Sequence, residues 1–218
     1  MHPAATEAIQ ISVPGGLIEA DLRIPERGRG LVIFAHGSGS SRFSPRNRSV
    51  AEYLEAHRLG TLLLDLLTRE EEVVDVATRE HRFDIDLLAI RVVLATDWAL
   101  GRTDLRELPI GYFGASTGAA AALVAAAERP ASVRAVVSRG GRPDLAHAAL
   151  PKVKAPTLLI VGGDDEPVIE MNRDAMRQMT GTVELQIVPG ATHLFEEPGT
   201  LQRVMALSAA WFERYLGA

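Results

Sequence analysis

The chain has 218 residues, with 23 Lys and Arg against 28 Asp and Glu and a net charge of −5 at neutral pH. Its 47% hydrophobic and 23% charged residues are ordinary for a globular protein and exclude a disordered, collagen-like or coiled-coil chain. The mild acidity argues against nucleic acid as a partner, because phosphate binding requires a basic face. The absence of cysteine excludes disulfides, a thiol nucleophile and cysteine-ligated metal sites.

The sequence contains no segment that predicts membrane insertion or export. The longest apolar candidate, residues 118–127, is rich in alanine and ten residues long, whereas a membrane-spanning helix needs about 20. Residues 1–7 lack the basic region and apolar stretch of a signal peptide. We therefore expect a soluble cytoplasmic protein with no membrane partner.

Apolar segments of strand length alternate with segments of helix length along most of the chain. A hairpin is expected first, because residues 9–13 and 17–24 flank Pro14-Gly15-Gly16. Further strands are predicted at 31–35, 61–65, 110–113, 133–137, 157–161 and 183–188, and helices at 46–58, 84–100, 116–128, 144–150, 168–179 and 201–216. Alternation of this kind predicts a single α/β domain over 1–218, with a mostly parallel sheet and helices on both faces.

Residues 66–83 fit this alternation least well. They are rich in charge, with Arg69-Glu70-Glu71-Glu72 and later Arg79-Glu80-His81-Arg82. A solvated connection between a strand and a helix is the expected interpretation, and a mobile flap over an active site is the alternative. In either case the insertion is too short to form a separate lid domain.

Ser116 lies in a G-x-S-x-G motif, Gly114-Ala115-Ser116-Thr117-Gly118, between a predicted strand and a predicted helix. A serine at this tight turn is held in strained backbone geometry, and the glycines remove side chains that would collide with neighbouring backbone. Its hydroxyl then stands at the head of a helix, where an oxyanion is stabilised. The alternative is an ordinary helix-capping serine.

A serine nucleophile needs a base and an orienting carboxylate, and both follow later strands in the chain. His193 comes after strand 183–188, and Gly162-Gly163-Asp164-Asp165 comes after strand 157–161. The order Ser, Asp, His is that of α/β-hydrolase triads. Spacing alone does not choose between Asp164 and Asp165, and both could be turn residues only. The other histidines are expected to serve elsewhere, most of them on the surface: His2, His36, His57, His81 and His147.

The loop His36-Gly37-Ser38-Gly39-Ser40-Ser41 follows the central apolar strand. Small residues let backbone N–H groups turn inward, and α/β hydrolases take one oxyanion donor from this loop and one from the residue after the nucleophile. These donors are predicted to be the N–H groups of Ser38 and Thr117. A phosphate cradle is the alternative, but the loop lacks both the Walker ending and the dinucleotide-binding glycine spacing.

Together these segments, with Gly190-Ala191-Thr192-His193-Leu194-Phe195, resemble the α/β-hydrolase superfamily, and more narrowly its small lid-less branch of dienelactone-hydrolase-like serine esterases. Arg82-Phe83-Asp84 and residues 138–144 also resemble that branch, including members fused to phosphoribosyltransferase-like domains. The resemblance covers about residues 9–216. It implies an eight-stranded sheet whose second strand is antiparallel, and in its Gly-Gly-x-Asp pattern the acid is Asp165.

The chain departs from true dienelactone hydrolases, which use a cysteine nucleophile and a glutamate, because it has Ser116 and no cysteine. We therefore expect a serine carboxylesterase that acts on a small ester without a metal or organic cofactor. A thioesterase or lactonase would use the same triad. A non-catalytic binding protein of the same fold is a further alternative. The oligomeric state is left open by the sequence.

Five residues in loops near the predicted strand ends are candidates for contact with the substrate. Phe43 and Phe195 are expected to form pocket walls, although Phe195 could equally pack beneath its own loop. Arg42, Arg139 and Arg142 are candidates for binding an anionic group, and of the three we expect Arg139 to contact the substrate. The alternative for each arginine is a solvated pair with a nearby carboxylate.

Overall fold

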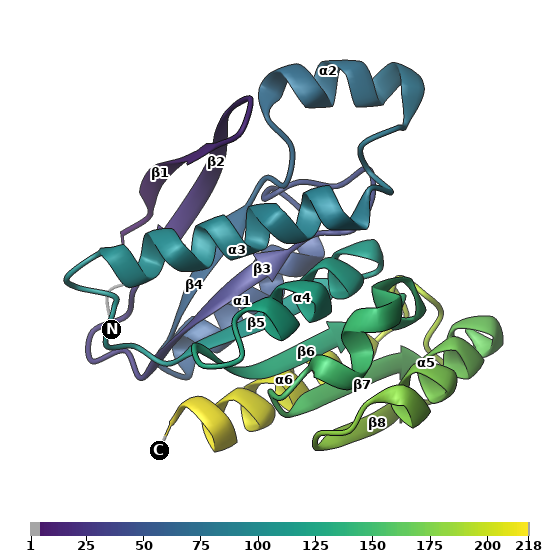
Figure 1. The fold of residues 1–218 in the computed structure, drawn as a ribbon. Helices are drawn as coiled ribbons and strands as arrows, with labels where there is room; N and C mark the ends of the chain where they lie inside the picture. The colour runs from purple at the N-terminus through teal and green to yellow at the C-terminus, as the bar shows by residue number, and fades with distance from the viewer. Residues whose placement is uncertain (1–4, 218) are drawn as a thin grey trace.

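The computed structural model describes residues 5–217, so residues 1–4, which include His2, and residue 218 lie outside the description (Figure 1). Within it, one sheet has the strand order β1-β2-β4-β3-β5-β6-β7-β8. β2 is antiparallel to β1 and β4, and the remaining neighbours are parallel. This confirms the predicted eight-stranded, mostly parallel sheet. The strands are β1 Glu7–Val13, β2 Gly16–Arg23, β3 Gly30–Ala35, β4 Leu59–Leu64, β5 Ile110–Ala115, β6 Val133–Arg139, β7 Thr157–Gly162 and β8 Val183–Val188.

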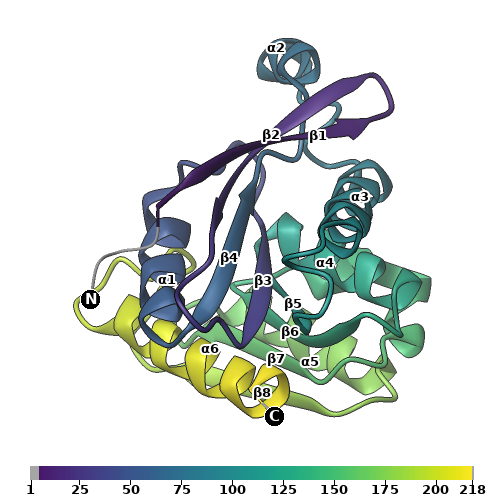
Figure 2. The ribbon, with the colours of Figure 1, turned by 90° about the vertical axis from the view of Figure 1, so that its left-hand side faces the viewer.

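Helices cover both faces of the sheet (Figure 2). On one face lie α1 (Pro45–Ala56) and α6 (Thr200–Leu216), whose apolar residues share a core with β3, β5 and β6. The other face carries α3 (Ile85–Gly101), α4 (Thr117–Glu128), the 3-10 helix η1 (Pro143–Lys152) and α5 (Glu166–Gln178). Strands β3 and β5 are buried along their whole length, as continuous apolar runs between two helical layers should be.

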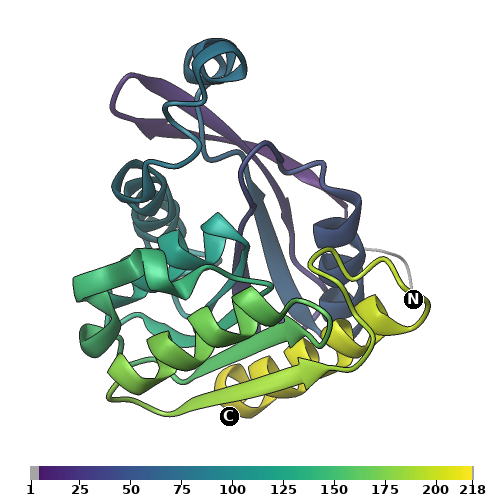
Figure 3. The ribbon, with the colours of Figure 1, turned by 90° about the vertical axis from the view of Figure 1, so that its right-hand side faces the viewer.

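The segment 66–83 contains a helix that the hydrophobic pattern did not predict, α2 (Arg69–Thr78). Thr68 and Glu71 form a reciprocal capping box at its start. The burial of its side chains is the reverse of that in an ordinary amphipathic helix, because Val73 is 71% exposed while Asp75 is 1% exposed. α2 stands away from the main body beside the tip of the β1–β2 hairpin (Figure 3). None of the helices described is long and apolar enough to cross a membrane.

Candidate active site

Ser116 occupies a strained turn between β5 and α4. Its φ of 51° and ψ of −123° lie outside the regions that most residues adopt. Its N–H donates to the carbonyl of Arg139 at 3.2 Å, and its own carbonyl accepts the N–H of Arg142 at 3.1 Å. The side chain makes no capping hydrogen bond with α4. The hydroxyl is therefore held by backbone strain at the head of the helix and is not used as a helix cap.

The two glycines of the motif allow the close packing that creates this turn. A Cβ at Gly114 would lie 2.4 Å from Cα of Ala119, and a Cβ at Gly118 would lie 2.3 Å from the carbonyl oxygens of Ala35 and His36. Atoms do not approach so closely, so any side chain at either position would separate α4 from β5 or from β3. The sequence requirement for glycine is thus steric at both positions.

His193 and Asp165 meet above the ends of β8 and β7. Nδ1 of His193 lies 2.7 Å from Oδ2 of Asp165, and this carboxylate is largely sheltered, with 15% of its side chain exposed. Asp164 is exposed, and its backbone N–H donates to the carbonyl of Ala191. The geometry thus brings Asp165, and not its neighbour, to the imidazole. A carboxylate on Nδ1 fixes the tautomer that leaves Nε2 free to accept a proton.

The loop that carries His193 is braced by its own side chains. Thr192 donates to the carboxylate of Glu197 through its N–H at 3.1 Å and its hydroxyl at 2.5 Å. Phe195 adopts a positive φ of 56° and is 2% exposed, packed in the core with residues of α6. Its ring lies beneath the loop, which was the alternative expected for it, and does not line the molecular surface.

Ser116 and His193 lie on either side of the turn that follows β6. This turn begins at Arg139, whose carbonyl holds the N–H of Ser116. At the next residue, Gly140, a Cβ would lie 3.1 Å from the carbonyl of His193 and 3.6 Å from Cε1 of its ring. Among the described residues the serine hydroxyl and the imidazole form no hydrogen bond, and in hydrolases this bond often tightens only when substrate is present.

The predicted oxyanion loop lies against Ser116, the predicted nucleophile. A Cβ at Gly37 would be 3.1 Å from Cβ of Ser116. The N–H of Ser38 donates to the hydroxyl oxygen of Thr117 at 2.9 Å, so this donor already has a partner, and the Thr117 hydroxyl keeps its own proton to donate. Sequence reasoning did not foresee this link between the two proposed oxyanion donors, because it joins side chain to backbone across 79 positions.

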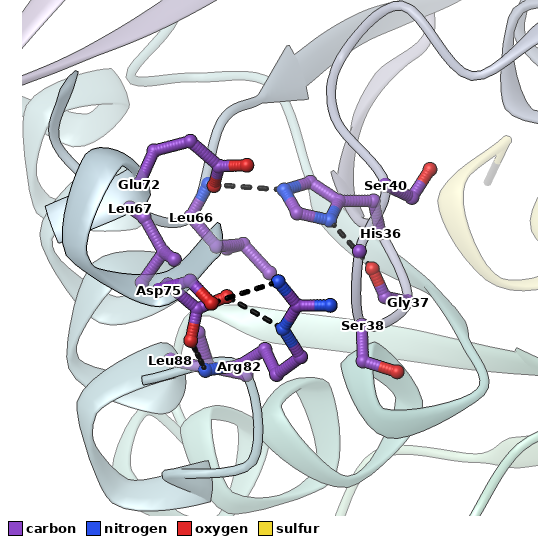
Figure 4. Close-up of a pocket in the computed structure, with 11 residues that line it drawn as sticks. His36, Gly37, Ser38, Ser40, Leu66, Leu67, Glu72, Asp75, Arg82 and Leu88 are labelled. Carbon is purple, nitrogen blue, oxygen red and sulfur yellow. Dashed lines mark hydrogen bonds and ion pairs between the residues drawn. The ribbon is translucent and has the colours of Figure 1, made fainter. Parts of the chain in front are cut away.

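His36 fixes the start of this loop as a buried, neutral imidazole. Nε2 accepts the N–H of Leu66 at 3.1 Å, so Nδ1 carries the proton and donates to the carbonyl of Gly37 at 2.9 Å (Figure 4). Burial lowers the pKa of His36 below its usual value, because a charged imidazole would lose hydration there. His36 thus ties the end of β3 to the segment that follows β4.

Asp75 and Arg82 support the oxyanion loop from the other side (Figure 4). Asp75 accepts Nε of Arg82 at 2.6 Å and the N–H groups of His81 and Arg82 at 2.9 Å. Burial alone would raise the pKa of Asp75, but the hydrogen bonds from Arg82 and the backbone lower it overall. Nη1 of Arg82 lies close to Gly39, where a Cβ would be 3.2 Å away. The capping box at Thr68 and Glu71 was a sequence signal that could have revealed α2, the helix that carries Asp75.

A groove of about 750 Å³ opens beside the oxyanion loop, between the tip of the β1–β2 hairpin and the start of α2. Phe43 lines it and is 52% exposed, with the guanidinium groups of Arg42 and Arg48 at 4.2 Å and 4.7 Å from its ring centre. The volume suits a small organic ligand. Phe43 is therefore exposed to a ligand in this groove, whereas Phe195 is buried, and none of Ser116, Asp165 and His193 lines the groove.

The three candidate arginines differ in their partners. Arg42 contacts carboxylates of Asp65 and Glu19, and Arg142 contacts Asp144 at 2.8 Å. Arg139 is 7% exposed and has no such partner within the described part of the chain. In the same residues no group of three or more His, Asp or Glu side chains is arranged to hold a metal ion.

Comparisons with known proteins identify close relatives of this chain. Residues 65–214 match the dienelactone hydrolase family. A dienelactone hydrolase from Anabaena variabilis has 60% sequence identity and a TM-score of 0.97, with 99% of this chain and 100% of that chain covered. An α/β serine hydrolase without a lid from Xanthomonas campestris has the same fold, with a TM-score of 0.78 at 19% identity over 100% of this chain and 98% of its own.

A curated relative from Mycobacterium tuberculosis is 54% identical over 214 residues, which is 98% of this chain. It bears a provisional name as a phosphoribosyl transferase. The match covers 47% of its length, so the chain spans about half of that protein.

Proposed function

The chain belongs to the dienelactone hydrolase family of α/β hydrolases, and on this basis we propose that it is a serine hydrolase that cleaves carboxylic esters. The observation that carries the proposal is the 2.7 Å contact between Nδ1 of His193 and Asp165, together with the strained turn that presents Ser116 beside the same loop cluster. The triad of Ser116, Asp165 and His193 supports acyl transfer through a serine ester.

In the first half of the reaction the oxygen of Ser116 attacks the ester carbonyl while Nε2 of His193 takes its proton. The resulting oxyanion accepts hydrogen bonds from the N–H of Thr117 and from the hydroxyl of Thr117, which the N–H of Ser38 orients, at the positive end of α4. Asp165 stabilises the imidazolium through Nδ1. His193 then protonates the leaving alcohol, the carbonyl re-forms and an acyl-enzyme remains.

In the second half, water attacks the acyl-enzyme with His193 again as the base. The acid product leaves, and Ser116 regains its proton. All of the proton transfers use groups of this chain, so the cycle balances with water as the only co-substrate.

The substrate we propose is a small, water-soluble ester, and only a part of it remote from the scissile bond can occupy the groove beside the oxyanion loop, because none of Ser116, Asp165 and His193 lines that groove. The groove is open to solvent between two surface elements, and Phe43 offers an apolar wall. The relative's provisional name does not alter this proposal, because that protein is about twice as long as the matched region. A thioester or lactone would fit the same chemistry, and a comparison of ester, thioester and lactone substrates would rank them.

The decisive test is covalent labelling with a fluorophosphonate followed by mass spectrometry. Stoichiometric modification of Ser116 that disappears in the Ser116→Ala variant is the expected result. Ester hydrolysis should fall by about 10⁴- to 10⁶-fold in Ser116→Ala and in His193→Ala. A folded wild-type protein that takes up no label would refute the proposal and favour a binding protein of the same fold.

A further inference from the structure

The β6 turn, residues 139–142, holds the backbone of Ser116 on both sides. The carbonyl of Arg139 accepts the N–H of Ser116 at 3.2 Å, and the N–H of Arg142 donates to the carbonyl of Ser116 at 3.1 Å. Ser116 has a positive φ of 51°, and strained backbone of this kind persists only where its surroundings fix it. The position of the Ser116 hydroxyl therefore depends on the contacts that fix the β6 turn.

The β6 turn is anchored at two points. The N–H of Gly140 donates to the carbonyl of Ile160 in β7 at 2.8 Å, which ties the first half of the turn to the sheet. The second half is held by Asn172, whose Nδ2 donates to the carbonyl of Gly141 at 3.0 Å and to that of Val168 at 2.8 Å. In the described part of the chain no other group donates to the Gly141 carbonyl. Asn172 is 0% exposed and Gly141 is buried, so loss of this bond would leave a carbonyl unpaired away from water.

The β6 turn also packs tightly against both halves of the candidate site. A Cβ at Gly141 would lie 1.9 Å from Oγ of Ser138 and 2.6 Å from Cβ of Ala119, which is in the first turn of α4. At Gly140 a Cβ would lie 3.1 Å from the carbonyl of His193. Because interiors packed this closely transmit small shifts, a movement of the turn would reach the head of α4 and the histidine loop together.

Asn172 belongs to the helix that also positions the candidate acid. Asp165 is the cap residue of α5, and Asn172 follows it by seven positions. Seven residues are about two helical turns, so the two positions lie on the same side of the helix. The start of α5 therefore directs Asp165 to His193, and the next turns direct Asn172 to the β6 turn.

The amide of Asn172 supplies something that an apolar side chain would not. Both of its near neighbours are carbonyl oxygens, so the NH₂ group must face them. Its Oδ1 is buried and has no hydrogen-bond partner among the described residues, which is unfavourable. An apolar side chain would fill the same place without that cost. The hydrogen bond to the β6 turn is therefore the contribution that only the amide makes.

We propose that Asn172 is a positioning residue for ester hydrolysis, which holds the β6 turn so that Ser116 and His193 keep their reacting geometry. The inference rests on the proposed function at Ser116 and adds to it a residue that touches no reacting atom. Asn172 acts through Gly141 and the turn, and takes no part in proton transfer. Its loss should therefore slow the chemical step and leave substrate binding almost unchanged.

The first test is Asn172→Ala, assayed with p-nitrophenyl acetate. We expect kcat and the rate constant for fluorophosphonate labelling to fall by about 10- to 100-fold, as misplacement of reacting groups does, while KM changes by less than about threefold. Thr157→Ala is the matched control. Its hydroxyl is also 0% exposed and donates to a carbonyl, that of Ala155, at 3.0 Å, but it lies at the opposite end of β7 from the site. This control should lower the urea midpoint as Asn172→Ala does and leave kcat within about threefold.

The second test is the pH profile of Asn172→Asp, which keeps the size of the side chain. A protonated carboxyl group can donate one hydrogen bond to Gly141, whereas an ionised one would face two carbonyl oxygens and repel them. The wild-type rate should rise with pH as His193 loses its proton and then level off. In Asn172→Asp the rate should pass through a maximum and fall at higher pH. Because this variant changes so little, it keeps the test decisive if Asn172→Ala folds poorly.

Wild-type kcat and labelling rate in Asn172→Ala, with a lowered urea midpoint alone, would make Asn172 a purely structural residue and overturn the proposal. An equal loss of kcat in Thr157→Ala, or a pH profile of wild-type shape in Asn172→Asp, would overturn it too. Labelling of the wild type keeps this failure distinct from failure of the proposed function. Labelling at equal rates in the wild type and the variants would remove only the positioning role, whereas absence of labelling in the wild type would remove ester hydrolysis and this role with it.

Discussion

Replacing Gly118 by alanine should damage the oxyanion site while leaving the fold intact. The added Cβ would start 2.3 Å from the carbonyl oxygens of both Ala35 and His36, and Cβ contacts under 3.0 Å are essentially never found. The start of α4 must therefore move by at least 0.7 Å away from the end of β3. That movement would separate the backbone nitrogen of Ser38 from the hydroxyl oxygen of Thr117, which now lie 2.9 Å apart.

A displacement of this size at reacting groups costs about 10²-fold in rate, and the strain should cost about 1 to 3 kcal/mol of unfolding free energy. We would measure kcat for a p-nitrophenyl ester, the rate of fluorophosphonate labelling and the urea midpoint. Gly101→Ala is the matched control, since nothing lies within 4 Å of its Cβ position. A Gly118→Ala enzyme with wild-type kcat and labelling rate would refute this account of the turn.

Three further predictions concern groups around the site. Asp165→Asn should lower kcat by about 10⁴-fold through loss of the correct imidazole tautomer, whereas Asp164→Asn should change kcat by less than about threefold. Equal losses of kcat in the two variants, measured in a steady-state assay, would contradict the assignment of Asp165 as the triad acid. Asp75→Asn should lower the unfolding free energy by about 2 to 4 kcal/mol at neutral pH. The pKa of Asp75 is lowered in the folded state. The stabilisation by its carboxylate should therefore be present above about pH 4 and be lost as the pH falls through the pKa of the folded state. The folded pKa of His36 is also lowered, so the unfolded chain binds the extra proton and stability should decline as the pH falls below about 6.5, until the folded pKa is reached. Urea titrations from pH 4 to 8 should show a smaller loss of stability on acidification in His36→Gln than in the wild type. The same pH profile in both proteins would contradict the role given to His36.

The strands and most of the helices could be predicted from the sequence because their signals are local, and the same signals predict the loop cluster that carries Ser116, Asp165 and His193. Each apolar run of the parallel sheet ends at glycine, proline or a polar residue, and parallel strands carry their carboxyl ends to one edge of the sheet. This is why Ser116 and His193, which lie 77 positions apart in the chain, could be assigned to one loop cluster. The G-x-S-x-G spacing likewise reflects a steric need that any sequence with this turn must meet.

Spacing alone did not distinguish residues whose local patterns are the same, and for Asp164 and Asp165 the family resemblance and the tertiary structure both select Asp165. Asp164 and Asp165 are adjacent, and the direction in which α5 begins turns one of them toward His193 and the other to solvent. α2 was missed because its valines face outward and Asp75 inward, the reverse of the pattern from which a helix is recognised. Arg42 pairs with Asp65, which lies 23 positions away, and Arg142 pairs with Asp144, two positions away, whereas no carboxylate of residues 5–217 pairs with Arg139. The contacts of Arg42 with Asp65 and of His193 with Asp165 join residues distant in sequence, and only the folded chain brings such partners together.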